Sequence, residues 1–176
     1  VVVVYDEAYR EYIDDPAYPD PMKYYERGDN IVIARTFSKI YGLAGLRVGY
    51  GIAKEEIIKA LLRVRSSFNV NTVANAAAMA ALDADDYVAK TVKVNNEGRD
   101  YLEKELKAMG MKVVPSVTNF ILVDTDYDAT ELFVKLQKQG VIIRPMRAFG
   151  MPNAFRITIG LKEENEKLIN ALKKVI

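Results

Sequence analysis

The most informative segment of the sequence is Thr36-Phe37-Ser38-Lys39-Ile40-Tyr41-Gly42-Leu43-Ala44-Gly45-Leu46-Arg47-Val48-Gly49-Tyr50-Gly51. It follows Ile31–Ala34, an apolar run rich in β-branched residues that predicts a buried strand. Thr36, Ser38 and Lys39 therefore fall where a strand gives way to a loop. Open α/β sheets bind their ligands at such strand ends.

The side chains of this loop are suited to an anion. Hydroxyl groups on Thr36 and Ser38 can donate to a phosphate, and the guanidinium of Arg47 can grip it from two sides. We expect Lys39, among these residues, to be partly shielded from water and shifted toward its neutral, nucleophilic form. Four glycines allow sharp turns and close approach of the backbone, and they are Gly42, Gly45, Gly49 and Gly51.

Composition alone leaves the role of Lys39 undecided. A lysine beside a glycine-rich loop is most often a solvated surface charge. The stretch is not a P-loop, because that motif has its glycines before the Lys-Ser/Thr pair and here they follow it.

The order of residues is more specific. The pattern T-x-S-K-x-x-G-L-A-G-L-R-x-G-Y resembles the lysine loop of the class I/II aminotransferases that use pyridoxal phosphate (PLP), and it is most similar to the histidinol-phosphate branch. In that family the lysine bonds covalently to PLP. The resemblance therefore assigns that role to Lys39, and it assigns the PLP phosphate to Thr36, Ser38 and Arg47.

A second motif lies near the N-terminus, where Asp6 follows the apolar run Val1–Tyr5. A carboxylate at the end of a strand is often an ordinary turn or cap residue. The phrase D-E-A-Y-x-E-Y, however, resembles the second PLP motif of the same family. The resemblance implies that Asp6 pairs with the protonated pyridine nitrogen and that the Tyr9 hydroxyl bonds the 3′ oxygen of PLP.

Two arginines near the C-terminus complete the candidate site. By spacing alone, an arginine on an alternating strand such as Phe155–Ile159 is more often exposed to solvent. The phrase F-R-I-T-I-G nevertheless resembles the family's segment that binds the substrate carboxylate, which assigns that role to Arg156. Arg144 matches an arginine at the substrate end of the histidinol-phosphate enzymes.

Composition excludes several other chemistries. The 176 residues include no cysteine and no histidine, which excludes disulfides, thiolate nucleophiles, Ser-His systems and histidine metal sites. A net charge of +1 gives no bulk attraction to nucleic acid or to an anionic membrane. No apolar run reaches the length of a membrane span and no signal peptide is visible, so we expect a cytoplasmic protein.

Periodicity predicts an α/β lobe followed by a smaller α+β lobe. The predicted strands are 1–5, 31–34, 48–52, 112–114, 119–123, 141–143 and 155–159, and the predicted helices are 22–26, 54–65, 73–82, 87–109, 129–139 and 162–175. The resemblance implies a fold-type I PLP architecture. Residues 1–86 would then be the later part of the large cofactor domain, and residues 87–176 the linking helix and the small C-terminal domain.

The chain opens on Val1–Val4 without an initiator methionine. Such a run is typical of a strand inside a parallel sheet, with neighbours on both sides. The family's glycine-rich phosphate cup and the residue stacked on the PLP ring are also absent. We therefore expect a piece of a longer protein, which by itself neither binds PLP tightly nor turns over.

The resemblance implies a homodimeric enzyme that transfers an amino group, with histidinol phosphate as donor and 2-oxoglutarate as acceptor, in histidine biosynthesis. Lys39 would also act as the general base. Three alternatives stay open: an aromatic amino acid aminotransferase, a PLP decarboxylase of the threonine-phosphate type, and the ligand-sensing domain of a transcription regulator. The last requires a helix-turn-helix domain upstream, and nothing basic in this chain supports contact with DNA.

Overall fold

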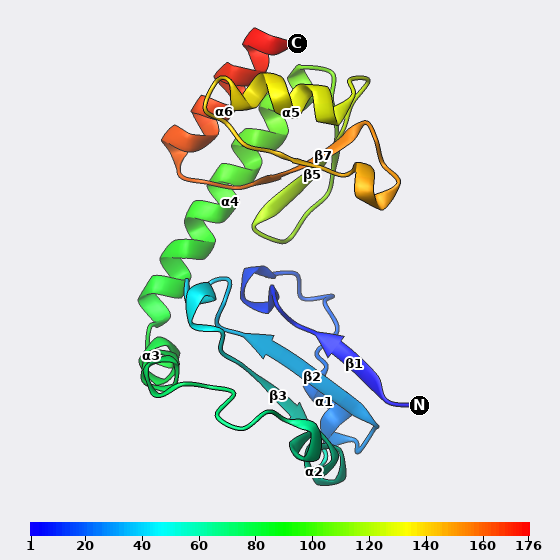
Figure 1. Cartoon of the computed structure of the whole chain (residues 1–176), viewed down its shortest axis with the longest axis vertical. Helices are drawn as coiled ribbons and strands as arrows, with labels where there is room; N and C mark the ends of the chain where they lie inside the picture. The colour runs from blue at the N-terminus through cyan, green and yellow to red at the C-terminus, as the bar shows by residue number, and fades with distance from the viewer. The chain divides into compact units, whose positions relative to one another are not determined.

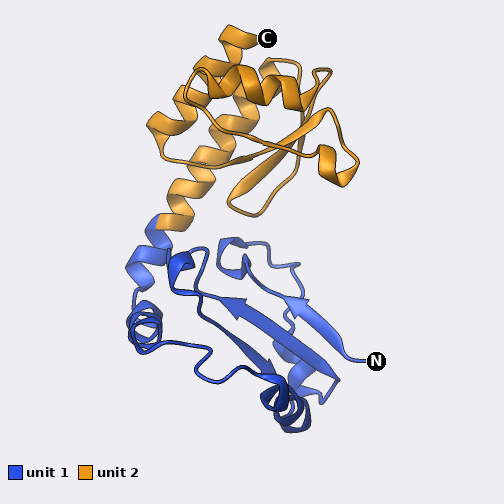
Figure 2. Ribbon diagram, viewed as in Figure 1, with its two compact units in different colours: residues 1–90 blue, residues 91–176 orange.

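The computed structural model describes residues 1–176, which separate into unit 1, Val1–Lys90, and unit 2, Thr91–Ile176 (Figure 2). The boundary falls inside the long helix α4 (Asp85–Ala108). None of the helices combines the length and the apolar character needed to cross a membrane.

Unit 1 is built on a three-stranded sheet in the order β1-β2-β3 (Figure 1). The strands are β1 (Val3–Asp6), β2 (Ile31–Thr36) and β3 (Gly49–Ala53). β1 pairs with β2 in parallel, and β3 pairs with β2 antiparallel. The rest of the unit comprises the helices α1 (Met22–Glu26), α2 (Glu55–Val64) and α3 (Thr72–Leu82), the first turns of α4, and the 3₁₀ turns η1 (Arg10–Tyr12) and η2 (Ala44–Leu46).

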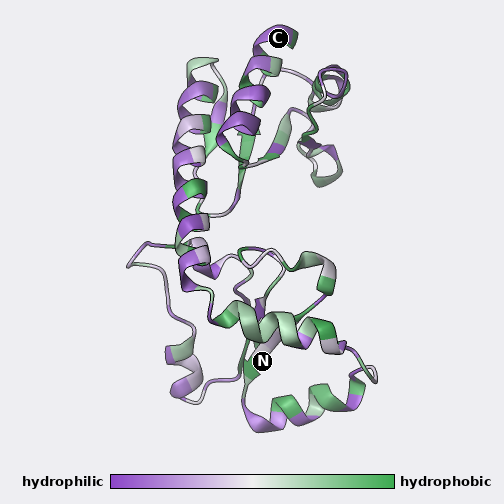
Figure 3. Cartoon of the chain, turned by 90° about the vertical axis from the view of Figure 1, so that its left-hand side faces the viewer, coloured by the Kyte–Doolittle hydropathy of each residue, from purple (hydrophilic) through white to green (hydrophobic).

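The loop between β2 and β3 packs on α3. Phe37 and Val48, at the two ends of the loop, form a buried cluster with Ala74 and Ala78 of α3. This helix of small residues is hydrophobic along most of its length (Figure 3). Its N-terminus is capped by Asn71, whose side chain accepts a hydrogen bond from the Ala74 N–H at 2.8 Å. The capped helix α3 and its small side chains therefore form the surface against which Phe37 and Val48 of the loop pack.

The N-terminal strand differs from the prediction. β1 begins at Val3, it pairs with β2 alone, and each of the side chains of Val1–Val4 is more than half exposed. The expectation of a buried strand with neighbours on both sides is therefore wrong for residues 1–176. The all-apolar run does specify parallel pairing, but burial also requires a neighbour on the second edge.

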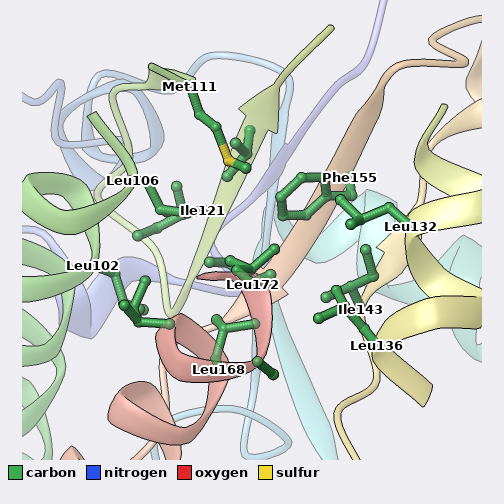
Figure 4. Packing of buried hydrophobic residues seen from close by; sticks show 14 of the residues in the cluster. Leu102, Leu106, Met111, Ile121, Leu132, Leu136, Ile143, Phe155, Leu168 and Leu172 are labelled. Carbon is green, nitrogen blue, oxygen red and sulfur yellow. The ribbon is translucent and has the colours of Figure 1, made fainter. Parts of the chain in front are cut away.

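Unit 2 contains an antiparallel sheet in the order β4-β5-β7-β6. The strands are β4 (Lys112–Val114), β5 (Phe120–Asp124), β6 (Arg144–Pro145) and β7 (Ala154–Thr158). With them are α5 (Ala129–Gln137), α6 (Lys162–Val175) and the turn η3 (Arg147–Phe149). Side chains from α4, α5, α6 and the sheet form one core (Figure 4), which includes Leu102, Leu106, Ile121, Phe155 and Leu172.

One predicted strand of unit 2 is displaced. Residues 141–143 are not a strand, and pairing with β7 begins only at Arg144. The Val141 N–H is used instead to close the end of α5, where it donates to the Leu136 carbonyl at 3.1 Å. Ile143 is 3% exposed and lies in the core. Residues 141–143 therefore close the end of α5 and contribute to the core, and they do not pair in the sheet.

Close packing in unit 2 depends on Gly98 of α4. A Cβ atom there would lie 2.7 Å from Cγ2 of Ile159 and 2.8 Å from Nδ2 of Asn165. Asn165 is 2% exposed, and its amide group binds both backbone groups of Gly160, each at 2.9 Å. This clamp fixes the turn between β7 and α6.

Candidate functional site

The loop after β2 is closed by its own backbone. The Phe37 N–H donates to the Val48 carbonyl at 3.2 Å, and the Leu43 N–H donates to the Phe37 carbonyl at 3.0 Å. At the start of the loop, Thr36 Oγ1 accepts from the Ser38 N–H at 3.0 Å. The hydroxyl of Thr36 is therefore held against the loop backbone at the end of β2.

Arg47 folds back onto the start of the same loop. Its Nη1 atom donates to Ser38 Oγ at 3.2 Å and to the Ala44 carbonyl at 2.9 Å. Arg47 has φ 54° and ψ 56°, which is a left-handed conformation that costs a residue with a Cβ atom about 1–3 kcal/mol. Since its guanidinium is exposed, the remaining donors are available to an anion beside Ser38.

Lys39 lies in the loop beside Tyr9. Its Nζ atom is 5.3 Å from the centroid of the Tyr9 ring, within the range of a cation–π contact. The side chain is exposed, so the expectation of a partly shielded lysine is wrong for residues 1–176. The reason is its place beyond the end of β2, where neither neighbouring strand covers it.

Asp6 ends β1 at the same end of the β1–β2 pair. It lies opposite Ala34 in the register, and residues two apart on a strand share a face, so Asp6 and Thr36 point to the same side of the sheet. Its Oδ1 atom accepts from the Ala8 N–H at 3.0 Å, which holds the carboxylate over the turn that leads to Tyr9. The carboxylate is exposed.

Two groups near Tyr9 have perturbed acidities. Burial, followed by the charges of Tyr87, Glu11 and Tyr9, raises the pKa of Tyr12 to about 12. Burial is also the largest cause that raises the pKa of Glu11. Tyr12 is 4% exposed and its ring centroid lies 6.5 Å from that of Tyr9, so a buried, uncharged phenol packs beside Tyr9.

A buried ion pair that the sequence did not predict lies beneath this site. Glu7 is 2% exposed, and its Oε2 atom accepts from Arg35 Nε at 2.7 Å. The second oxygen, Oε1, lies 3.6 Å from Arg10 Nε and has no hydrogen-bond partner. The sequence offered one signal for this pair, because Glu7 directly follows a run that predicts a buried strand, and a charge in such a place requires a partner.

In unit 2, the structure brings the two predicted arginines together. Arg144 and Arg156 lie opposite each other on β6 and β7. The guanidinium carbons lie over aromatic rings, with Arg156 4.6 Å from the Phe120 centroid and Arg144 5.5 Å from that of Phe149. Both arginines line a cavity of about 520 Å³. Two cations paired across the neighbouring strands β6 and β7 are suited to an anionic substrate group.

Comparisons with known proteins give matches over essentially the whole chain. The family model described as aminotransferase class I and II matches residues 1–172. A histidinol-phosphate aminotransferase of Caldicellulosiruptor saccharolyticus is 47% identical over 176 residues, and one of Moorella thermoacetica is 49% identical over 177 residues. Each alignment covers 100% of this chain, with 49% of the first relative and 46% of the second. The chain thus spans about half the length of these curated relatives.

One solved structure has the same fold as this chain. The histidinol-phosphate aminotransferase of Sinorhizobium meliloti in complex with pyridoxal-5′-phosphate superimposes with a TM-score of 0.87 and 29% identity. The match covers 100% of this chain and 50% of that one. The α/β unit with a lysine loop, followed by an α+β unit, is therefore the fold-type I architecture of PLP enzymes. Within that class, the chain belongs to the family of class I and II aminotransferases.

The side chains of unit 1 fit the chemistry of PLP. The cofactor has an aldehyde, a phosphate, a phenolic oxygen and a basic ring nitrogen, and the loop and the end of β1 present an amine, an anion-binding pair, a phenol and a carboxylate. The Ser38–Arg47 contact at 3.2 Å brings together a hydroxyl and a guanidinium, which are donors of the kind that a phosphate accepts from. The residues present are thus compatible with this cofactor.

Proposed function

We propose that the protein containing this chain is a PLP-dependent aminotransferase, with histidinol phosphate as amino donor and 2-oxoglutarate as acceptor. The observation that carries the proposal is the grouping in unit 1: Asp6, the Tyr9–Lys39 contact and the Ser38–Arg47 contact occupy the same end of the β1–β2 pair. The histidinol-phosphate aminotransferases at 47% and 49% identity support this choice of substrate.

PLP, when bound, supplies an electron sink for the carbanion that forms when the amino substrate loses its α-proton. Asp6 would hold the ring nitrogen in its protonated form, and the Tyr9 hydroxyl would donate to the 3′ oxygen. Thr36, Ser38 and Arg47 would hold the phosphate. The left-handed backbone of Arg47 supports this assignment, because strained residues cluster at ligand sites.

Lys39 would have two tasks. Its amine would anchor the cofactor covalently until the substrate amine takes its place. Once released, Nζ would take the proton from the substrate α-carbon and later return one. Residues 1–176 contain no histidine, so within this chain a lysine, a carboxylate or a tyrosine must move protons near neutral pH.

Arg156 would bind the α-carboxylate of an amino acid substrate through a bidentate pair, and Arg144 would also contact the substrate. Their opposition on β6 and β7 supports a shared role. We further propose that residues 1–86 belong to the large cofactor domain and residues 87–176 to the linking helix and the small domain. The enzyme would be a cytoplasmic homodimer.

The test uses the full-length protein with all sequence that surrounds residues 1–176. PLP is added, the sample is reduced with borohydride, and the labelled peptide is mapped. A pyridoxyl group on Lys39, together with an oxo product from histidinol phosphate, is the expected result. A label on another lysine contradicts the site, and carbon dioxide in place of an oxo product contradicts the reaction.

A further inference from the structure

A buried ion pair lies next to two of the proposed cofactor residues in the sequence. Glu7 follows Asp6 at the end of β1, and Arg35 precedes Thr36 at the end of β2. The bond from Arg35 Nε to Glu7 Oε2 is 2.7 Å long and joins segments 28 residues apart. Each member of the pair is thus the immediate neighbour of a residue proposed to hold PLP.

The pair and the proposed ligands lie on opposite faces of the sheet. Side chains alternate along a strand, so Arg35 points away from the face that carries Asp6 and Thr36. The Glu7 N–H donates to the Ala34 carbonyl at 2.9 Å, which extends the ladder one residue past β1. The ion pair therefore closes the open end of the β1–β2 ladder directly beneath the site.

Because the Glu7–Arg35 pair is buried, the loss of either partner would be unfavourable. The Glu7 side chain is 0% exposed and that of Arg35 is 22% exposed. A charge-assisted hydrogen bond in such surroundings is strong and directional, and a carboxylate left there without its partner is unfavourable. By contrast, Arg10 reaches the same carboxylate only at 3.6 Å and is 41% exposed. Arg35, rather than Arg10, is the partner that fixes Glu7.

We propose that Glu7 is a positioning residue for the cofactor: its ion pair with Arg35 sets the spacing between Asp6, at the ring nitrogen, and Thr36, at the start of the phosphate loop. This inference rests on the proposed function, because it requires PLP to lie between these two residues. Glu7 itself does not touch the cofactor. It acts through Asp6 on one side and, by way of Arg35, through Thr36 on the other.

The experiment compares Glu7→Gln with Arg10→Gln in the full-length protein. Glu7→Gln keeps the volume and removes the charge that Arg35 requires, and Arg10→Gln removes the weaker, exposed partner of the same carboxylate. For each variant we would measure the dissociation constant of PLP, the pH midpoint of the visible band of the bound cofactor, and the thermal unfolding of the protein without PLP. The first two readouts report on the cofactor, and the third reports on the fold alone.

We expect Glu7→Gln to weaken PLP binding by roughly tenfold, the scale found where a residue that orients a ligand is replaced, and to shift the pH midpoint of the band. Arg10→Gln should leave both unchanged. The proposal is overturned if Glu7→Gln lowers only the unfolding temperature, or if both variants weaken PLP binding equally.

A third variant covers the case in which Glu7→Gln does not fold. Arg35→Lys keeps a cation at this position of β2 but loses the planar guanidinium, and it should also weaken PLP binding and shift the band. Wild-type binding and an unshifted band in Arg35→Lys overturn the proposal. Failure of the wild-type protein to take PLP on Lys39 contradicts the proposed function instead, so the two failures are distinguishable.

Discussion

Arg47 and Ser38 stand nine residues apart in the sequence, yet Arg47 Nη1 lies 3.2 Å from Ser38 Oγ. The contact forms because the backbone of Arg47 turns left-handed at φ 54°, which returns the chain to the start of the loop. A guanidinium and a hydroxyl held in contact before any ligand arrives are a preorganised anion site.

This contact predicts the effect of Arg47→Lys. Lysine keeps the positive charge but has no planar fork, so it cannot hold both Ser38 and a phosphate in the same geometry. Loss of a hydrogen bond to a charged group corresponds to about 1.5–3 kcal/mol, and we expect the dissociation constant of PLP to rise roughly tenfold or more. The measurement is a titration of the full-length protein with PLP.

A matched control is Arg65→Lys, because Arg65 is exposed and bonds only the neighbouring side chain of Asn69, at 2.9 Å. It should bind PLP as the wild type does. If both variants weaken PLP binding by the same factor, Arg47 has no special role in holding the phosphate.

Lys39→Arg tests the proposed chemistry directly. Arginine keeps the charge near the Tyr9 ring but does not lose its proton near neutral pH, so it can neither bond to the cofactor nor move the α-proton. We expect kcat to fall by at least about a hundredfold, the lower end of general-base contributions. Spectra should show PLP bound without a borohydride-reducible bond.

Lys54→Arg is the companion variant for that experiment. Lys54 Nζ donates to Asn30 Oδ1 at 3.3 Å, a contact that arginine can reproduce on the exposed surface. Full activity of Lys54→Arg, with loss of activity in Lys39→Arg, is the expected outcome. Appreciable turnover by Lys39→Arg refutes the assignment of Lys39 as the base.

Much of the fold follows from local pattern. The helix predicted over 162–175 matches α6 in full, because charges and apolar residues alternate there at helical spacing and Glu164 caps its start through the Leu161 N–H at 2.8 Å. The short helix at 22–26 also matches. Local signals fail at Val141, whose N–H closes α5, because a three-residue apolar run does not encode its hydrogen-bond partner.

Long-range relationships explain the rest of what the sequence could not predict. The motifs identify Asp6 and Lys39 as candidates, but only the register of β1 on β2 shows that Asp6 and Thr36 share a face. The Glu7–Arg35 pair joins two segments 28 residues apart, and no spacing rule connects them. The exposure of Lys39 likewise depends on what packs over the loop, which its own residues do not specify.

Gly45 lies in the loop between β2 and β3, and Gly49 is the first residue of β3. A Cβ atom at Gly49 would lie 2.6 Å from the backbone oxygen of Arg35, whereas one at Gly45 would have nothing within 4 Å. Because the Arg35 backbone belongs to β2 and cannot rotate away, Gly49→Ala should destabilise the fold by about 1–3 kcal/mol. Gly45→Ala should be close to neutral. Urea unfolding of the two variants checks this, and equal stabilities contradict it.

The last prediction concerns Asp128, which caps α5. Its Oδ1 atom accepts from the Thr130 N–H at 2.8 Å and from the Glu131 N–H at 3.1 Å, and Oδ2 contacts Arg147. The bond from Glu131, followed by that from Thr130 and by Arg147, holds the pKa of Asp128 below its ordinary value of 3.8.

A depressed pKa in the folded state stabilises the fold above the unfolded value of 3.8, and this stabilisation is lost as the pH falls through the folded-state pKa. Asp128→Asn keeps the cap but removes the charge, so it should be less stable than the wild type at neutral pH and equal to it below the folded-state pKa. Asp128→Ala loses the cap as well and should be less stable than Asp128→Asn at neutral pH. The measurement is the free energy of unfolding in urea across this pH range. If the difference in this free energy between the wild type and Asp128→Asn does not change with pH, the charge of Asp128 contributes nothing to stability.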